Sequence, residues 1–229
     1  AVSANRSPVL RFWPILLLAA AGGFVSLSYE IFFFRTVSYA SGSSATAFAV
    51  TLSAFLVGIA SGSRQAGEQC RTATQAETIR RLVDTLLMAC LLGVLFLPLL
   101  DHLAWLKTGL VGVAMLMVYV LARFWGAVLP NLAELSIAAD ERAGMQTAFL
   151  YLANILGSAA GSVITGFVLM DHLGLVAISA TLSVAGVLYT LVLIVFLTAP
   201  FEVKLRRTAL AVAIGLTAAV VGPCFSAHL

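Results

Sequence analysis

The chain has 229 residues, of which 61% are hydrophobic and only 10% carry a charge, and its formal net charge is +3. Soluble domains contain about 25% charged residues, so this composition excludes an ordinary soluble protein and indicates a polytopic helical membrane protein. The apolar runs are continuous and do not alternate with polar residues, which excludes a transmembrane β-barrel. We therefore expect a single integral membrane domain over residues 1–229.

Apolar runs close to the roughly 20 residues that cross a bilayer as a helix follow one another along the whole chain. The first is far longer than the apolar core of a signal peptide, and no small-residue cleavage pattern follows it, so we expect a retained span. Pro130 is expected to break or kink the fourth span. The sequence thus predicts an all-α transmembrane bundle of seven spans, at about 12–39, 45–63, 82–100, 108–129, 145–170, 173–198 and 208–221.

Polar segments connect these runs. Residues 64–81 form the longest of them and contain four arginines. Apolar positions are sparse there, so we predict a loop or a short surface helix. Residues 131–144 are also polar and are predicted to connect the fourth and fifth spans.

The basic residues of the connecting segments set the orientation. Only Lys107 falls on one side of the seven-span arrangement. The other side carries Arg6, Arg11, Arg64, Arg71, Arg80, Arg81, Arg142, Lys204, Arg206 and Arg207. The positive-inside rule then places the N-terminus in the cytoplasm and the C-terminus outside the inner membrane. Cys70 and Cys224 would lie on opposite sides and Cys90 within a span, so we expect three free thiols, with Cys70 labelled only from the cytoplasm.

Glu30 lies inside the first apolar run, where a charge is costly unless it faces a partner or a water-filled cavity. Ser26 and Gly22 or Gly23 precede it on the same helical face, so this face is small and polar and can line a cavity or admit a close neighbour. Two interpretations stay open for Glu30. It is either a carboxylate that binds a proton or a cation, or a structural anchor between helices.

Two arginines also lie near the ends of spans. Arg35 is about 140° around the helix from Glu30, so it does not face that carboxylate, and it either snorkels to the interface or binds anionic groups. Arg123 either snorkels at the cytoplasmic face or pairs with a carboxylate such as Glu134. Glu134 itself is expected to be a solvated residue.

Small residues form stripes on the second and fifth spans. Gly58 and Gly62 make one GxxxG pattern, and Gly157 and Gly161 make another, which lets helix backbones approach closely. Asn154 continues the second stripe, and a buried amide needs hydrogen-bond partners.

Metal and cofactor signals are weak. The outer loops repeat one tripeptide, at residues 101–103 and 171–173, in which Asp precedes His. Such pairs at helix ends are more often caps than divalent-metal ligands, so we expect no metal. The sequence contains no GxGxxG after a strand, no P-loop, no HExxH and no Ser-His-Asp set, and no catalytic pair is visible. We therefore expect no cofactor and no nucleic-acid partner.

The segments Phe24–Arg35 and Gly42–Ser63 resemble the membrane region of the spermidine-synthase-like membrane proteins, a polyamine aminopropyltransferase-like family. Further matches are Leu129-Pro130-Asn131-Leu132, the run from Tyr151 to Gly161, and the segment from Gly166 to Gly174. The resemblance implies spans arranged like half of a major facilitator transporter. In such transporters the second and fifth spans of the two halves meet, so the resemblance implies that the two small-residue stripes meet between two copies of the chain. The expected homodimer would have Glu30 and Asn154 lining a central cavity. In that family the spans are often fused to an aminopropyltransferase-like domain. The residues here include no nucleotide-type glycine loop or acidic substrate site, so we expect no aminopropyl transfer from them.

Two functions follow. The first is a transporter-like protein that binds or moves a small solute, with a cationic, polyamine-like one as the candidate. Its expected substrate-binding residues are Glu30, Asn154, Arg35, Tyr29 and Tyr151. The alternative is a non-transporting module in the lipid bilayer that anchors or regulates a soluble aminopropyltransferase-like partner. A membrane-embedded enzyme is less well supported because no catalytic pair is visible.

Overall fold

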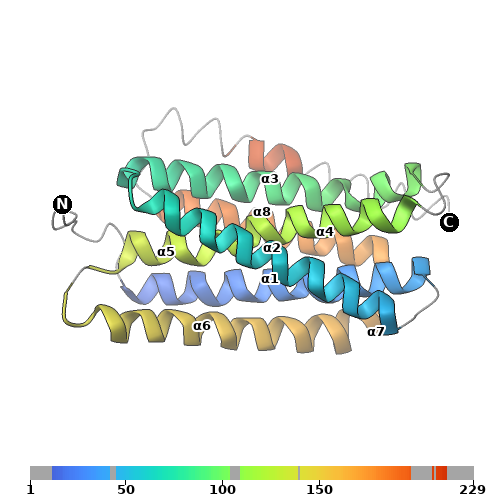
Figure 1. Cartoon of the computed structure of the whole chain (residues 1–229), viewed down its shortest axis with the longest axis horizontal. Helices are drawn as coiled ribbons and strands as arrows, with labels where there is room; N and C mark the ends of the chain where they lie inside the picture. Colours follow the sequence, from blue (N-terminus) through green and yellow to red (C-terminus); the bar gives the residue numbers. More distant parts are fainter. Residues whose placement is uncertain are drawn as a thin grey trace.

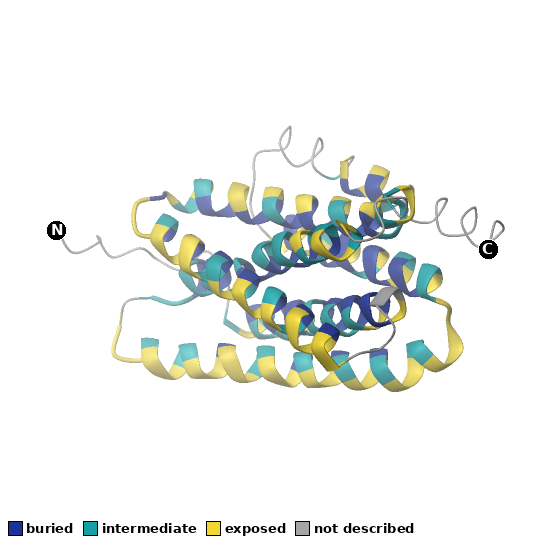
Figure 2. Cartoon of the chain, turned by 45° about the vertical axis from the view of Figure 1, so that its right-hand side comes forward, coloured by how far each residue is buried: buried dark blue, intermediate teal, exposed yellow. Residues whose placement is uncertain are grey.

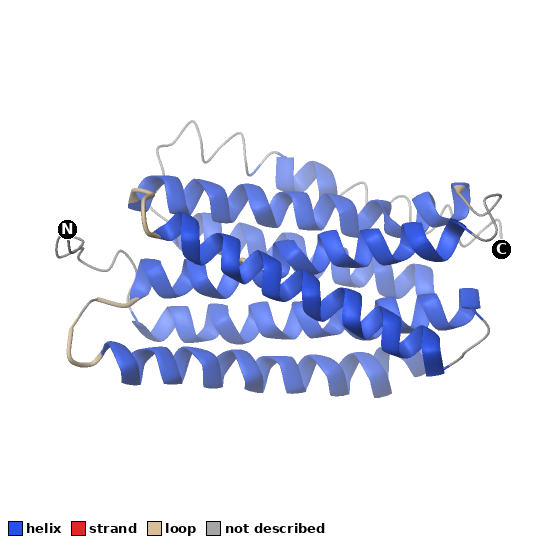
Figure 3. Ribbon diagram, viewed as in Figure 1, coloured by secondary structure: helices blue, strands red, loops and turns tan. Residues whose placement is uncertain are grey.

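Helices are the only regular elements in the described part of the computed structural model, which covers residues 12–41, 45–103, 109–138, 140–196, 208 and 210–215 (Figure 3). The all-α prediction is therefore confirmed. The helices are α1 (Phe12–Ser41), α2 (Ala45–Cys70), α3 (Gln75–His102), α4 (Leu110–Gly126), α5 (Val128–Ser136), α6 (Ala143–Val163), the π-helix η2 (Ile164–Leu169), α7 (Met170–His172) and α8 (Leu175–Phe196).

These helices form six stretches that are long and apolar enough to cross a membrane, as far as the described residues go. Four of them are α1, α2, α3 and α8, and the other two are Leu110–Ser136 and Ala143–His172. Residues 208 and 210–215 are helical, but the rest of the predicted seventh span, 208–221, lies outside the described residues. The length and apolar composition of these helices indicate that the protein is an integral membrane helical bundle (Figure 1).

The prediction of a loop or a short surface helix at residues 64–81 is wrong, because most of the segment belongs to two long helices. α2 continues through Arg64 to Cys70, and α3 begins at Gln75, so the connection is a short turn. Polar residues extend both helices beyond the apolar core because they find local partners. Arg64 Nε bonds Glu68 Oε1 at 2.9 Å, four residues along α2. Thr74 and Glu77 form a capping box that starts α3.

The polar segment predicted at residues 131–144 is also corrected, because its first part is a buried helix. α4 ends at Gly126 and α5 starts at Val128, so the fourth span is broken just before Pro130, as predicted. Proline has no N–H to donate to the carbonyl of Gly126, four residues earlier. Beyond the break, α5 remains helical and buries Asn131 and Leu132.

Two helix pairs are packed with their backbones almost in contact, α1 with α6 and α2 with α4 (Figure 1). A Cβ atom at Gly157 would overlap the carbonyl oxygen of Ala20 on α1. On the second pair, a Cβ atom at Gly58 would lie 2.5 Å from the Tyr119 carbonyl oxygen, and one at Gly62 would overlap the carbonyl of Arg123. Gly161 packs on Phe24 in the same way. The predicted packing role of these small faces is therefore seen within one chain.

This arrangement corrects the reasoning behind the predicted homodimer. The faces that were expected to meet between two copies are already covered, one by α4 and the other by α1. Gly58 and Gly161 belong to different pairs, so they offer no free surface for a second copy. The GxxxG patterns predicted close packing, but a pattern on one helix does not determine which helix packs against it.

The core lies between α1, α3, α4 and α8 and is rich in aromatic rings. Phe33 and Phe96 have ring centroids 4.8 Å apart, and Tyr29 stacks on Phe33 at 5.6 Å. α6 instead stands at the edge of the bundle, with exposed residues along its length (Figure 2). Exposed apolar residues such as Leu152, Leu156 and Phe167 are those expected to face lipid. We call the end of the bundle that carries Arg64, Arg71, Arg80, Arg81 and Arg142 the arginine end.

Candidate functional site

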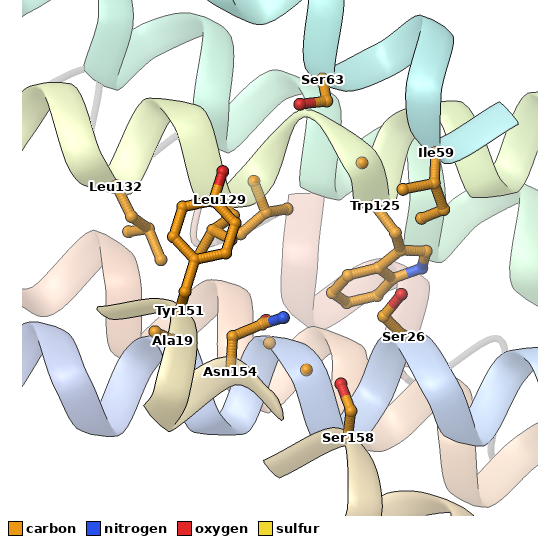
Figure 4. A pocket seen from close by; sticks show the side chains of 14 residues that line it. Ala19, Ser26, Ile59, Ser63, Trp125, Leu129, Leu132, Tyr151, Asn154 and Ser158 are labelled. Atoms are coloured by element: carbon orange, nitrogen blue, oxygen red, sulfur yellow. The ribbon is translucent and has the colours of Figure 1, made fainter. Parts of the chain in front are cut away.

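A cavity of about 230 Å³ lies between the two closely packed helix pairs. α1 and α6 form one side, and α2 and the junction of α4 with α5 form the other (Figure 4). Its polar side chains are Ser26, Ser63, Tyr151, Asn154 and Ser158, and its apolar lining includes Ala19, Ile59, Trp125, Leu129 and Leu132. Drug-sized ligands need about 300 Å³ or more, so the space suits a smaller molecule.

Helical spacing brings the polar groups to one place. Tyr151, Asn154 and Ser158 are three and four residues apart, so they share the face of α6 that meets α1. Gly23 has no side chain, and a Cβ atom there would lie 2.8 Å from Ser158 Oγ and 2.9 Å from Asn154 Oδ1. These two side chains therefore lie directly over the α1 backbone. Figure 4 shows the Asn154 amide and the Tyr151 ring pointing from α6 into the cavity.

The polar lining is not used for internal hydrogen bonds. None of its five side chains bonds to another described residue. Two other hydroxyls in the spans instead bond to their own helix: Thr51 donates to the Ala47 carbonyl at 2.7 Å, and Thr190 to the Gly186 carbonyl at 2.8 Å. In an apolar membrane an unsatisfied polar group costs several kcal/mol, so the cavity groups need water or a solute.

Two buried aromatic side chains beside the cavity also lack partners. Trp125 lines the cavity and is only 4% exposed, yet its indole Nε1 makes no hydrogen bond within the described structure. Tyr189 packs against Trp125 with ring centroids 6.1 Å apart, and its hydroxyl is also buried without a partner. That hydroxyl reaches Gly22 on the cavity wall, where a Cβ atom would lie 3.1 Å from it. Trp125 Nε1 on the cavity wall and the Tyr189 hydroxyl close to it are thus two polar groups that a hydrogen-bonding molecule would satisfy.

The expectation that the small polar face before Glu30 lines a cavity or admits a neighbour is confirmed, because Gly22, Gly23 and Ser26 line this cavity. Glu30 itself lies one helical turn beyond Ser26, is half-buried, and is not part of the lining. It makes no hydrogen bond or ion pair with any described residue. Its role as a proton or cation site stays a prediction.

The other predicted binding residues divide between the cavity and places far from it. Asn154 and the half-exposed Tyr151 line the cavity. Tyr29 does not, because it is fully buried in the aromatic core, with its hydroxyl 3.4 Å from Ser183 Oγ. Arg35 is exposed, and its Nη2 donates to the Tyr39 hydroxyl at 3.1 Å. That contact directs the guanidinium toward the end of α1, as expected of a snorkelling side chain.

Sequence reasoning missed Ser63 and Trp125. Both lie near the ends of the predicted spans 45–63 and 108–129, and nothing on their own helices distinguishes them from their neighbours. Only the packing of α2 against α4 turns both toward α1 and α6. Arg123 does not pair with Glu134 and instead bonds Gln65 through Nε at 3.1 Å. No cluster of three or more His, Cys, Asp or Glu that could hold a metal occurs among the described residues.

Comparison with known proteins gives no family model, no curated sequence and no solved structure that matches the chain. The resemblance noted from the sequence therefore stays a prediction, and the site is interpreted from its own chemistry. Fold and site together define a class, an integral membrane helical bundle with a polar cavity between two closely packed helix pairs. Such a cavity can bind a small molecule by hydrogen bonds and exclude lipid from it.

Proposed function

We propose that this protein is transporter-like and binds a small solute in the cavity between α1, α2, α4–α5 and α6. The observation that carries the proposal is the set of polar lining groups without partners in an otherwise apolar bundle. In the apolar interior of a membrane each unsatisfied polar group costs several kcal/mol, so five such side chains around one cavity favour a bound polar molecule. The position between two separate helix pairs also suits a site whose walls move relative to each other.

The lining favours an uncharged polar solute over the polyamine-like cation suggested by the sequence. No Asp, Glu, Lys or Arg lines the cavity, and Glu30 lies outside it. A cation there would lack a carboxylate partner. Trp125 offers little cation–π binding, because its ring packs between Tyr29 and Tyr189, with centroids 6.0 and 6.1 Å away. The amide of Asn154 and the serine hydroxyls instead suit a solute with N–H, O–H or carbonyl groups.

The test is a thermal-unfolding screen of the purified protein against amines, amino acids and nucleosides. A ligand that binds the folded state stabilises it by about 2.7 kcal/mol at a hundred times its Kd. We expect uncharged nucleoside-like solutes to raise the unfolding temperature and polyamines to leave it unchanged. Stabilisation by polyamines alone would contradict the proposed solute class. If no solute stabilises the protein, the alternative role as an anchor for an aminopropyltransferase-like partner is favoured.

Asn154→Leu should abolish most of that ligand-induced shift. Leucine fills similar space but offers no hydrogen bond, so the affinity should fall about tenfold or more. Glu30→Gln is the control, since Glu30 lies outside the lining and the amide has nearly the same shape. It should keep the shift. Equal loss in both variants would instead assign ligand binding to the region around Glu30.

We further propose the inner membrane as location, with the arginine end in the cytoplasm. The native Cys70 is a poor reporter of this, because it is buried and its Sγ lies 3.5 Å from Asn131 Oδ1. Arg71→Cys, at an exposed position in the turn after α2, should react with an impermeant thiol reagent only after the cells are opened. Asp171→Cys, at the opposite end of the bundle, should react in intact cells. The reverse pattern would overturn the orientation.

A further inference from the structure

A second cavity, of about 380 Å³, lies at the arginine end between α2, α3, α4 and α5. It shares no lining residue with the first cavity. The close contact of α2 and α4, where Gly62 meets the backbone of Arg123, stands between the two. The polar side chains that line the second cavity are Gln65, Gln69, Arg81, Asp84, Thr85, Arg123 and Asn131.

Arg123 brings an unneutralised positive charge to this cavity. It is half-buried, and its guanidinium donates from Nε at 3.1 Å and from Nη2 at 2.5 Å to one oxygen of Gln65. Glutamine is neutral, so this contact orients the guanidinium without cancelling its charge. An arginine has five N–H donors, and three of them remain for another partner.

Arg81 adds a second positive charge on the α3 side. Neither Arg81 nor Arg123 forms an ion pair with any described carboxylate. The lining holds one carboxylate, Asp84, against these two arginines, so the lining side chains carry an excess of one positive charge. Glu77, four residues before Arg81 on α3 and outside the lining, also interacts with it electrostatically. Gln69 and Thr85 have no side-chain hydrogen bond to a described residue and can also donate.

Asn131, which lines the second cavity, is held in place by hydrogen bonds. Asn131 is buried, donates from Nδ2 to the Ala127 carbonyl at 2.6 Å, and approaches Cys70 of α2 through its Oδ1. These contacts join α2 to α5 directly beneath the arginines. A rigid wall with an oriented guanidinium is the arrangement expected of a preformed ligand site.

We propose that this second cavity binds a phosphate group. Planar guanidinium groups match phosphate oxygens with paired N–H donors, and two arginines with a hydroxyl and an amide provide the donor set. Two sources present this chemistry at the end of a membrane bundle: the headgroup of an anionic phospholipid, and a soluble phosphate compound. The proposal is independent of the solute cavity, because no residue is shared.

The experiment compares thermal unfolding of the protein in neutral detergent with three additions. These are phosphatidylglycerol, phosphatidylcholine as the zwitterionic control, and inorganic phosphate against chloride at equal ionic strength. Stabilisation by phosphatidylglycerol but not by phosphatidylcholine identifies a lipid headgroup, and stabilisation by inorganic phosphate identifies a soluble ligand. No stabilisation by either phosphatidylglycerol or inorganic phosphate overturns the proposal.

Variants separate the cavity from general surface charge. Arg81→Gln and Arg123→Gln should each weaken the apparent affinity about tenfold or more. Arg80→Gln is the matched control, because Arg80 is the adjacent exposed residue at the same end but does not line the cavity. It should keep the affinity within about twofold. Equal losses in the Arg80 and Arg81 variants would overturn the site. Arg81 is exposed, so its variant should fold even where Arg123→Gln does not.

Discussion

Gly62→Ala and Gly157→Ala should each lower the free energy of unfolding by about 1–3 kcal/mol, as overpacked interiors do. A methyl group at Gly62 would overlap the carbonyl oxygen of Arg123 on α4, and one at Gly157 would overlap that of Ala20 on α1. In each case the obstacle is a helix backbone and not the end of a flexible side chain. The two helices of that pair would have to move apart, so Gly62→Ala opens the α2–α4 contact and Gly157→Ala opens the α1–α6 contact.

Gly67→Ala provides the matched control on the same helix as Gly62. No atom lies within 4 Å of a Cβ placed at Gly67, so only the helix propensity changes. Alanine is favoured over glycine in a helix by about 0.5–1 kcal/mol, and this variant should unfold at the same temperature or higher. The measurement is thermal or denaturant unfolding in detergent, followed by circular dichroism. Equal unfolding of the Gly62 and Gly67 variants would contradict the close approach of α2 and α4.

The spans were predictable from the sequence because each is a long apolar run, and apolar length is what a bilayer requires. Where the helices end was less predictable. α2 runs on to Cys70 with exposed residues stabilised by the Arg64–Glu68 pair. The start of α3 was readable in principle, since Thr74 and Glu77 have the spacing of a capping box.

The small-residue faces show which structural features a sequence pattern on one helix can predict. The glycines at 58, 62, 157 and 161 predicted close backbone contacts, and all four make them. The partner helices were predicted wrongly, because a GxxxG pattern specifies a smooth helix surface but does not determine which helix packs against it. The choice of α4 for α2, and of α1 for α6, is made by the whole bundle.

The site was predicted only in part for the same reason. Asn154 and Tyr151 stood out because polar side chains in an apolar run are expensive. Ser63 and Trp125 did not, since serine and tryptophan are ordinary residues in a span. Tyr29 was also expected among the binding residues, but it lies about 100° around α1 from Glu30, and the structure places it in the core.

The central claim is that the cavity between the helix pairs is a hydrated solute site. The cavity of about 230 Å³ has room for several waters, each of which takes roughly 30 Å³ in the liquid. Ser26 lines this space without a hydrogen-bond partner among the described residues. Ser183 is a matched serine on α8 that is 0% exposed in the core, beside Tyr29. A cysteine at each position therefore compares the cavity with the packed interior.

The deciding measurement is the rate at which a small, water-soluble thiol reagent modifies these cysteines in a variant that lacks the three native ones. The thiolate is the nucleophile that attacks such a reagent, and it forms readily only where water reaches the sulfur. Ser26→Cys should react at least about a hundred times faster than Ser183→Cys, because thiolate formation is suppressed in apolar surroundings. A solute that binds the cavity should slow the Ser26→Cys reaction. Equally slow modification of both cysteines would show a dry, closed interior at Ser26 and would contradict the proposed site.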